Sequence, residues 1–152
     1  MFTRIQALRF RCLRYVDQRL GRFVTLVGPN ASGKTTFLDV IGFLSDVVRS
    51  GGKVADVVLE RSATFHDLLW LGEGDSFELA VEAELPVRIR SELKQDLADY
   101  TRVRYEISVT YDAEANLIGL GQEVLWLLTE ETPEPAVPEL FPAPEVPPPT
   151  LF

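Results

Sequence analysis

The sequence has little of the chemistry that builds covalent or metal-centred sites. Its 152 residues include one cysteine, Cys12, and one histidine, His66. A single cysteine cannot form an internal disulfide or a cysteine cluster for metal, which favours a reducing, cytoplasmic compartment. We expect Cys12 to be a core or strand residue rather than a nucleophile, and His66 to be structural, because neither has a partner for chemistry in the sequence.

Long hydrophobic runs are also missing. No apolar stretch approaches the roughly 20 residues that a membrane-spanning helix needs. Residues 1–4, Met-Phe-Thr-Arg, lack the apolar segment and small-residue cleavage site of a signal peptide. The sequence therefore predicts a cytoplasmic protein with no membrane partner, and 46% apolar residues are enough to build one core.

Basic residues are absent beyond Arg104, whereas acidic residues continue to Glu145. The start of the chain is the reverse, since six arginines precede residue 28 together with one acid, Asp17. These arginines are Arg4, Arg9, Arg11, Arg14, Arg19 and Arg22. The net charge of −8 argues against general nucleic-acid affinity, and the basic segment has two interpretations, a solvated strand face or a DNA-facing surface.

Alternation of apolar and polar residues predicts a set of strands. Strands are expected at 2–10, 23–27, 77–85, 103–111 and 117–128, and residues 13–17 either extend the first strand or start a second one. The run at 23–27, Phe-Val-Thr-Leu-Val, reads as a buried strand that stops at Gly-Pro. The last two strands are joined by a hairpin loop at 112–116. The first strand is expected to place Ile5 and Ala7 on one face, with Arg9 as a candidate third member, and Leu8 with Phe10 on the other.

Helical spacing begins at Lys34. Apolar residues recur there at three- and four-residue steps, and they are Phe37, Leu38, Ile41, Leu44 and Val48. The Ser-Gly-Gly at 50–52 is expected to end this helix. Residues 54–60 and 63–71 read as short helices or loop, and 90–100 as a short helix or a crossing loop.

Proline is concentrated near the end, where eight of the ten prolines lie in residues 133–149. Because proline supplies no backbone donor, this stretch is expected to be an extended tail or linker. We therefore predict a folded domain at 1–132 and an acidic, proline-rich tail at 133–152. The tail has two interpretations: a plain linker, which is the simpler one, or a segment that binds aromatic-lined grooves of another protein.

One segment carries specific chemistry. Residues 28–35 match the phosphate-binding pattern Gly-x-x-x-x-Gly-Lys-Thr, between a predicted strand and a predicted helix. The two glycines allow torsions that turn successive N–H groups toward an anion, and the helix adds its positive end. Lys34 is expected to reach the β- and γ-phosphates, Thr35 to bind Mg²⁺ and Thr36 to contact the α-phosphate. The predicted nucleotide-binding residues are Gly28, Pro29, Asn30, Ala31, Ser32, Gly33, Lys34, Thr35 and Thr36.

The loop's interior resembles a known family. Residues 28–38, Gly-Pro-Asn-Ala-Ser-Gly-Lys-Thr-Thr-Phe-Leu, resemble the P-loop of ABC-type ATPases, and among them the RecF, SMC and OLD-like group of AAA-family ATPases. Residues 8–13 resemble that group's Ile-x-Asn-Phe-Arg-x-Phe segment, with Arg9 in place of Asn. The resemblance implies ATP and Mg²⁺ as ligands and a position near the nucleotide for Arg11. It also implies an α/β P-loop NTPase fold, of which this chain is the N-terminal lobe, with an antiparallel sheet beside the P-loop strand and helix.

Other parts of that family's catalytic machinery are not recognisable. The family requires a Q-loop, a signature motif, a Walker B strand ending in Asp-Glu and a switch histidine. We reject residues 117–122 as a signature and 124–131 as Walker B, because the two segments nearly touch and leave no parallel strand beside the P-loop. One terminal antiparallel strand explains both segments. No catalytic residue is assigned.

Several functions remain open from the sequence. The first is an ATPase of the RecF, SMC or OLD-like type, in DNA maintenance or defence, with a head-to-head dimer or a second polypeptide supplying the missing lobe. DNA as a partner rests on resemblance alone. The alternatives are a nucleotide-binding module without turnover or a truncated fragment, an ABC-transporter nucleotide-binding domain, and an interaction protein that uses its tail.

Overall fold

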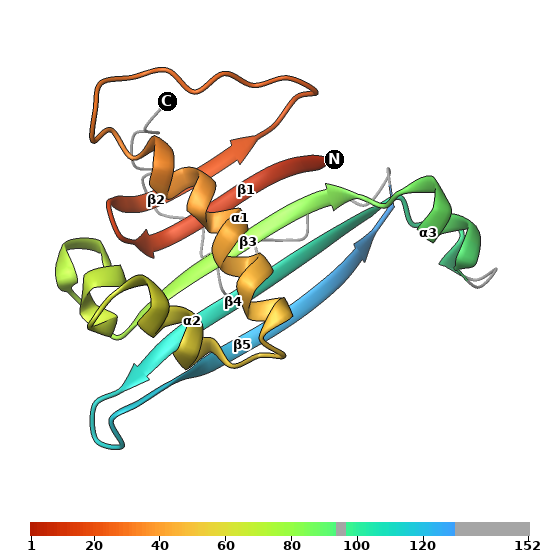
Figure 1. The fold of residues 1–152 in the computed structure, drawn as a ribbon. Helices are drawn as coiled ribbons and strands as arrows, with labels where there is room; N and C mark the ends of the chain where they lie inside the picture. The colour runs from red at the N-terminus through yellow and green to blue at the C-terminus, as the bar shows by residue number, and fades with distance from the viewer. Residues whose placement is uncertain (94–96, 130–152) are drawn as a thin grey trace, which may run out of the picture.

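The computed structural model describes residues 1–93 and 97–129, which form one sheet with its helices mainly on one face (Figure 1). The strands are β1 (Phe2–Phe10), β2 (Leu13–Arg19), β3 (Ser76–Glu84), β4 (Arg102–Asp112) and β5 (Leu117–Leu128). The helices are α1 (Lys34–Arg49), α2 (Val54–Arg61) and α3 (Val87–Glu92), with 3-10 turns at Phe65–Leu68 and Trp70–Gly72. The strand order is β2-β1-β3-β4-β5, and all neighbours are antiparallel. The tail predicted at 133–152 lies outside the described residues.

The long alternating segments form strands as predicted. Residues 77–85 and 103–111 correspond to β3 and β4, with ends shifted by one residue, and 117–128 is β5. The β4–β5 connection is the hairpin expected at 112–116. Residues 117–128 form the one antiparallel strand that was predicted to explain this segment.

β1 departs from simple alternation near its end. Arg9 has a φ of 57°, a left-handed conformation that interrupts the pleat and turns the next side chain to the other face. Phe10 is therefore fully buried on the same face as Ile5 and Ala7. The prediction that grouped Phe10 with Leu8 was wrong, because it assumed an unbroken strand.

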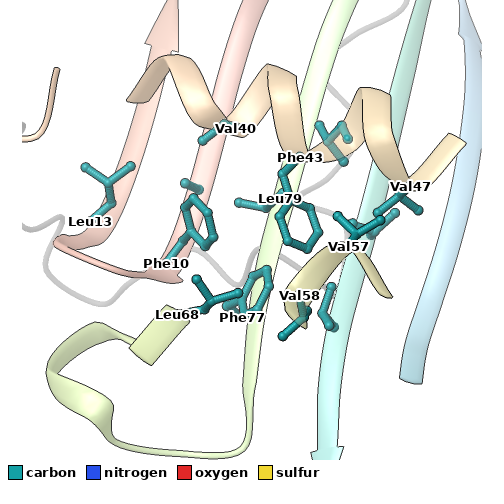
Figure 2. Close-up of a cluster of buried hydrophobic side chains, with 14 of the residues drawn as sticks. Phe10, Leu13, Val40, Phe43, Val47, Val57, Val58, Leu68, Phe77 and Leu79 are labelled. Carbon is teal, nitrogen blue, oxygen red and sulfur yellow. The ribbon is translucent and has the colours of Figure 1, made fainter. Parts of the chain in front are cut away.

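α1 crosses the sheet and supplies the centre of the core. Its buried residues are Phe37, Val40, Phe43, Leu44 and Val47. The Phe43 ring lies 5.8 Å from that of Phe10 and 5.5 Å from that of Phe77, both edge-on (Figure 2). The predicted apolar face was partly wrong, since Leu38 and Val48 are 56% and 62% exposed. The helix carries more apolar positions than the sheet can cover, and the sheet covers the side that contains Phe43.

The segment between α1 and β3 forms the short elements that were expected. α2 and the turn at Phe65–Leu68 bury Val57, Val58 and Leu68 near Phe77 (Figure 2). His66 is exposed, and its ring lies edge-on to Tyr111 at 5.4 Å. Within residues 1–93 and 97–129, no helix is long and apolar enough to cross a membrane.

The predicted strand at 23–27 is absent. These residues have no strand pairing, and Phe23 and Val27 are 87% and 77% exposed. In Figure 1 the chain between β2 and α1 forms a long loop that swings away from the sheet. A buried parallel strand needs hydrogen-bonding neighbours, and no described strand lies beside this run to supply them. The prediction of a strand at 23–27 was wrong, because no strand among the described residues pairs with this segment.

The sheet face opposite α1, which we call the polar face, carries buried polar and charged side chains near its centre. Its buried polar side chains are Gln6, Glu78, Glu82, Arg104, Glu106 and Ser108. Arg4 donates two hydrogen bonds to the Asp17 carboxylate, at 2.7 and 2.6 Å, and Arg9 lies 3.2 Å from a Glu78 oxygen. Arginines of the basic segment thus pair with acids of β2 and β3, so a freely solvated face was the wrong interpretation for them.

The Arg4–Asp17 pair predicts an acid-dependent loss of stability. Partial burial by itself would raise the pKa of Asp17, but the hydrogen bonds from Arg4 outweigh it and hold the pKa below its usual range. The unfolded chain therefore binds more protons, and the pair's stabilisation, present at neutral pH, is lost as the pH falls below about 4. Urea unfolding should show a smaller loss between pH 6 and pH 3 for Asp17→Asn than for the original chain. Parallel losses in the two proteins would contradict this.

Candidate nucleotide-binding site

The predicted phosphate-binding loop lies between the exposed segment at 23–27 and α1. Gly28 has a φ of 154°, Gly33 of 89°, and Ala31 a left-handed φ of 64°. A Cβ built on Gly28 would lie 2.9 Å from Ser32 Oγ, so this position requires glycine. The backbone therefore makes the tight turn that an anion-binding loop of N–H groups needs.

Lys34 folds back across this loop. Its Nζ donates to the Gly28 carbonyl at 2.9 Å, to the Pro29 carbonyl at 2.6 Å and to Ser32 Oγ at 3.1 Å. These three acceptors surround the ammonium with neutral oxygens, with which its charge interacts more weakly than with anions. Phosphate oxygens entering the loop would be stronger partners for the same group. Lys34 Nζ thus lies against the loop backbone, and its contact with the β- and γ-phosphates stays a prediction.

The N-terminus of α1 opens into the same region. Gly33 is the N-cap, no side chain in the described structure caps the helix there, and its first turn contains no acid. The first N–H groups of a helix have no acceptor within it, so an anion can accept from them. Thr35 is exposed and Thr36 half-buried in this turn. The structure therefore brings together the loop, the lysine and both threonines.

Arg11 is held against α1 rather than against the loop. Its φ is 51°, and its backbone N–H donates to the Leu68 carbonyl at 2.8 Å. Its guanidinium lies 3.4 Å from Asp39 Oδ2, and Asp39 is also 3.4 Å from Arg61. The predicted contact of Arg11 with the nucleotide stays a prediction. The structure shows instead that an ion pair with Asp39, on the second turn of α1, holds the Arg11 side chain.

Asp39 and Arg61 were missed by the sequence reasoning. Arg61, on α2, forms ion pairs with both Asp39 and Asp46 of α1, and Arg61 Nη2 lies 2.6 Å from Asp46 Oδ2. These ion pairs hold α2 against α1. Two acids seven residues apart lie on one face of a helix, which was the available signal. Nothing in the sequence indicated that an arginine of a later helix would meet them.

Cys12 corrects another expectation. It is exposed in the turn between β1 and β2, not part of the core or of a strand. Its thiol lies 3.4 Å from Thr36 Oγ1, in the first turn of α1. The β1–β2 turn therefore touches the helix end that follows the loop, a contact made through the tertiary fold that local pattern cannot reveal.

The site suits a nucleotide carrying its own metal ion. No three His, Cys, Asp or Glu side chains of residues 1–93 and 97–129 are grouped to bind a metal. Thr35 offers one hydroxyl, so Mg²⁺ would draw its other ligands from phosphate oxygens and water, as Mg²⁺ does in many ATPase sites. The residues present fit Mg²⁺ together with a triphosphate.

Comparisons with known proteins show the family of the chain. Residues 23–136 match the family described as "AAA domain, putative AbiEii toxin, Type IV TA system". The chain is also 48% identical over 48 residues to an OLD nuclease of Thermus scotoductus. That alignment takes in 31% of this chain but 9% of the nuclease, so the chain corresponds to a small part of that relative. With most of its length matched, including the loop and α1, the chain belongs to this AAA-domain family of P-loop NTPases.

Proposed function

We propose that the chain binds ATP with Mg²⁺ through residues 28–36, as part of an OLD-like ATPase. The observation that carries this is Lys34, whose Nζ lies within 3.1 Å of three loop oxygens, at the centre of the loop. On binding, the ammonium would exchange these neutral acceptors for β- and γ-phosphate oxygens. The N–H groups at the start of α1 would bind the remaining phosphate oxygens. Bound Mg²⁺, held in part by Thr35, would offset phosphate charge.

A calorimetric titration of the purified chain with ATP tests this proposal. We expect saturable one-to-one binding in the presence of Mg²⁺, and weaker binding in EDTA, because the Thr35 hydroxyl would then lose its link to the phosphates. Replacing Thr35 with valine, which keeps the shape but removes the hydroxyl, should make the Mg²⁺ and EDTA titrations alike. No binding heat from a chain that circular dichroism shows to be folded would contradict the proposal.

We further propose that a second polypeptide, or a further part of a larger protein, covers the exposed segment at 23–27. Phe23, Val27 and, on α1, Leu38 each expose more than half of their surface. A group of exposed apolar residues next to a binding loop marks a surface for protein contact. A partner strand there would complete the sheet beside the loop, and its chain would also have to supply the acid for hydrolysis. A head-to-head dimer is compatible with this arrangement.

Replacing Phe23 and Val27 together with serine tests whether that surface is free. Because neither side chain is in the core, we expect the free energy of unfolding to change by less than about 0.5 kcal/mol per site. Binding of a hydrophobic dye to the folded chain should fall at the same time. A loss of stability of several kcal/mol, as for a core residue, would show that the segment is buried and would contradict the proposed partner surface.

A nucleotide-binding module without turnover is the second candidate. Asp39, the first acid after the loop, already faces Arg11 and Arg61, so it is not free to position a water. ATP would then stabilise the folded chain by mass action rather than be consumed. Mg²⁺-dependent phosphate release by the pure chain, absent from Lys34→Ala, would exclude this candidate. A role in DNA maintenance or defence remains what the resemblance favours.

A further inference from the structure

The two edges of the sheet differ in composition. One edge strand, β2, has 7 residues, of which Arg14, Asp17 and Arg19 are charged. The other, β5, has 12 residues, of which Glu123 is charged (Figure 1). Because an edge strand offers backbone N–H and C=O groups to any strand that approaches, proteins protect edges with charge, proline or short strands. β2 is short and charged, whereas β5 is long and contains no lysine, arginine or proline.

One part of β5 offers a regular edge. Its pairing with β4 is interrupted between Ser108 and Val109, where Gly121 is an extra residue in a bulge. Beyond the bulge, residues 122–128 pair with β4 one by one without a break, and we call these residues the edge segment. Among residues 1–93 and 97–129, no strand lies on the outer side of the edge segment. A partner strand therefore has room to pair with its whole length.

Apolar side chains point to both sides of the sheet along the edge segment. Directly paired residues of an antiparallel sheet share a side. Leu125 pairs with Tyr105 and lies on the α1 side, and Trp126 lies on the polar face. They are 63% and 45% exposed. Because an antiparallel strand that faces water normally carries polar residues on its solvated side, this composition indicates that the edge segment has a partner.

The apolar surface continues from the edge segment onto the sheet. A groove of about 500 Å³ lies beside α1, and its lining includes Phe2, Leu44, Val48 and Tyr105. Tyr105 is the β4 partner of Leu125, so the groove adjoins the edge segment. Val48, near the end of α1, is largely exposed there. A contiguous patch of this kind, unlike a single exposed leucine, marks a surface for protein contact.

The edge segment is complementary to a second copy of itself. If two copies pair antiparallel about a two-fold axis at its midpoint, Leu125, this residue lies opposite the partner's Leu125, and Trp126 lies opposite the partner's Val124. Apolar and aromatic side chains are favourable cross-strand pairs. Glu123 lies opposite the partner's Leu127, so the two Glu123 carboxylates are four residues, or roughly 14 Å, apart along the strands. At physiological salt, where charges are screened over about 8 Å, they repel little.

We propose that β5 pairs with β5 of a second copy through the edge segment, antiparallel and about a two-fold axis at Leu125. Two five-stranded sheets thereby join into one continuous sheet, with both α1 helices on the same side. The paired segment is short for an interface, so the association is weak and reversible. The contact does not involve residues 23–36, and it requires neither nucleotide nor the partner surface at 23–27.

Sedimentation equilibrium of the full chain tests the proposal. We expect the mass to rise from 17.1 kDa toward twice that value between about 1 and 300 µM protein, because a micromolar dissociation constant suits an interface of this size. Leu125→Lys, which places charge on the edge, should weaken the association at least about 10-fold. Its thermal midpoint should change little, because Leu125 is exposed. A chain that stays at 17.1 kDa throughout, or that grows beyond a dimer, would overturn the proposal.

Leu117→Lys is the matched control. Leu117 is 64% exposed and lies on the same strand, but outside the edge segment. This variant has the same net charge as Leu125→Lys and should associate within about twofold of the original chain. The double variant Phe23→Ser, Val27→Ser should associate like the original chain. Equal losses in the two lysine variants, or loss of association in the serine variant, would place the contact elsewhere and overturn the proposal.

Disulfide trapping tests the register. In a Cys12→Ser background, Leu125→Cys should form a disulfide-linked dimer on mild oxidation, because the two Cα atoms would be about 4.5 to 5.5 Å apart. Leu127→Cys, on the same side of the strand, should remain unlinked, because the two copies of that residue would be about four residues apart along the strands. Equal trapping at the two positions, or trapping at 127 in preference to 125, would overturn pairing about Leu125.

Discussion

Replacing Lys34 with alanine is expected to weaken MgATP binding by at least about 100-fold while leaving the chain folded. The ammonium would make charge-assisted hydrogen bonds to the phosphates, each contributing about 1.5 to 3 kcal/mol, and two of them correspond to 100-fold or more. Among residues 1–93 and 97–129, the hydrogen-bond acceptors of Lys34 are all atoms of the loop, from Gly28, Pro29 and Ser32. The substitution should therefore change the thermal midpoint by no more than a few degrees.

Lys53→Ala is the matched control for that substitution. Lys53 is exposed and lies just before α2, outside the loop, and its loss changes the net charge by the same amount. We expect the affinity of this variant for MgATP to stay within about twofold of the original, because a single distant surface charge is screened by salt. Equal affinities of the Lys34 and Lys53 variants would show that nucleotide binds elsewhere.

Replacing Phe43 with alanine should destabilise the chain by about 3 to 5 kcal/mol, a large part of the stability expected of a domain of this size. Phe43 is fully buried between Phe10 and Phe77, and Arg61 lies over its ring with its Cζ 5.0 Å from the ring centroid. Removing it leaves a cavity where α1 meets β1 and β3. Because α1 starts at the phosphate-binding loop, loss of its packing should also weaken nucleotide binding.

Val48→Ala is the matched control, because it also shortens an apolar side chain of α1 but at an exposed position. Val48 is largely exposed, so its replacement should cost less than about 0.5 kcal/mol in a urea titration. If the folded chain binds MgATP, the Phe43 variant should also regain part of its stability at saturating MgATP, since a ligand that binds the folded state stabilises it. Similar losses for Phe43→Ala and Val48→Ala would contradict the assigned buried face of α1.

The parts of the fold that depend on short-range pattern were predictable. β3 and β4 follow from the alternation of apolar and polar residues, and β5 follows as the return strand after the hairpin loop at 112–116. The loop and the start of α1 follow from a spacing in which each residue type has a defined task, Gly28 for its φ and Lys34 for its charge. Local chemistry alone decides these features, so the sequence suffices for them.

The features that depend on distant neighbours were not predictable. The left-handed φ of Arg9 turns Phe10 into the core, and no local signal favours that conformation for arginine. The run at 23–27 has the composition of a strand, but a strand requires a partner, which the described chain does not provide. The ion pairs of Asp39 depend on where β1 and α2 meet α1, which only the tertiary fold determines.

The most direct test of nucleotide binding by this loop is a nitrogen–proton correlation spectrum of the 17.1 kDa chain, recorded with and without MgATP. The account predicts the largest shifts at the amides of Gly33, Lys34 and Thr35, where the loop meets the N-terminus of α1. Smaller shifts should follow at Cys12, which contacts Thr36. A spectrum unchanged at saturating MgATP, or shifts centred away from residues 28–36, would contradict the account.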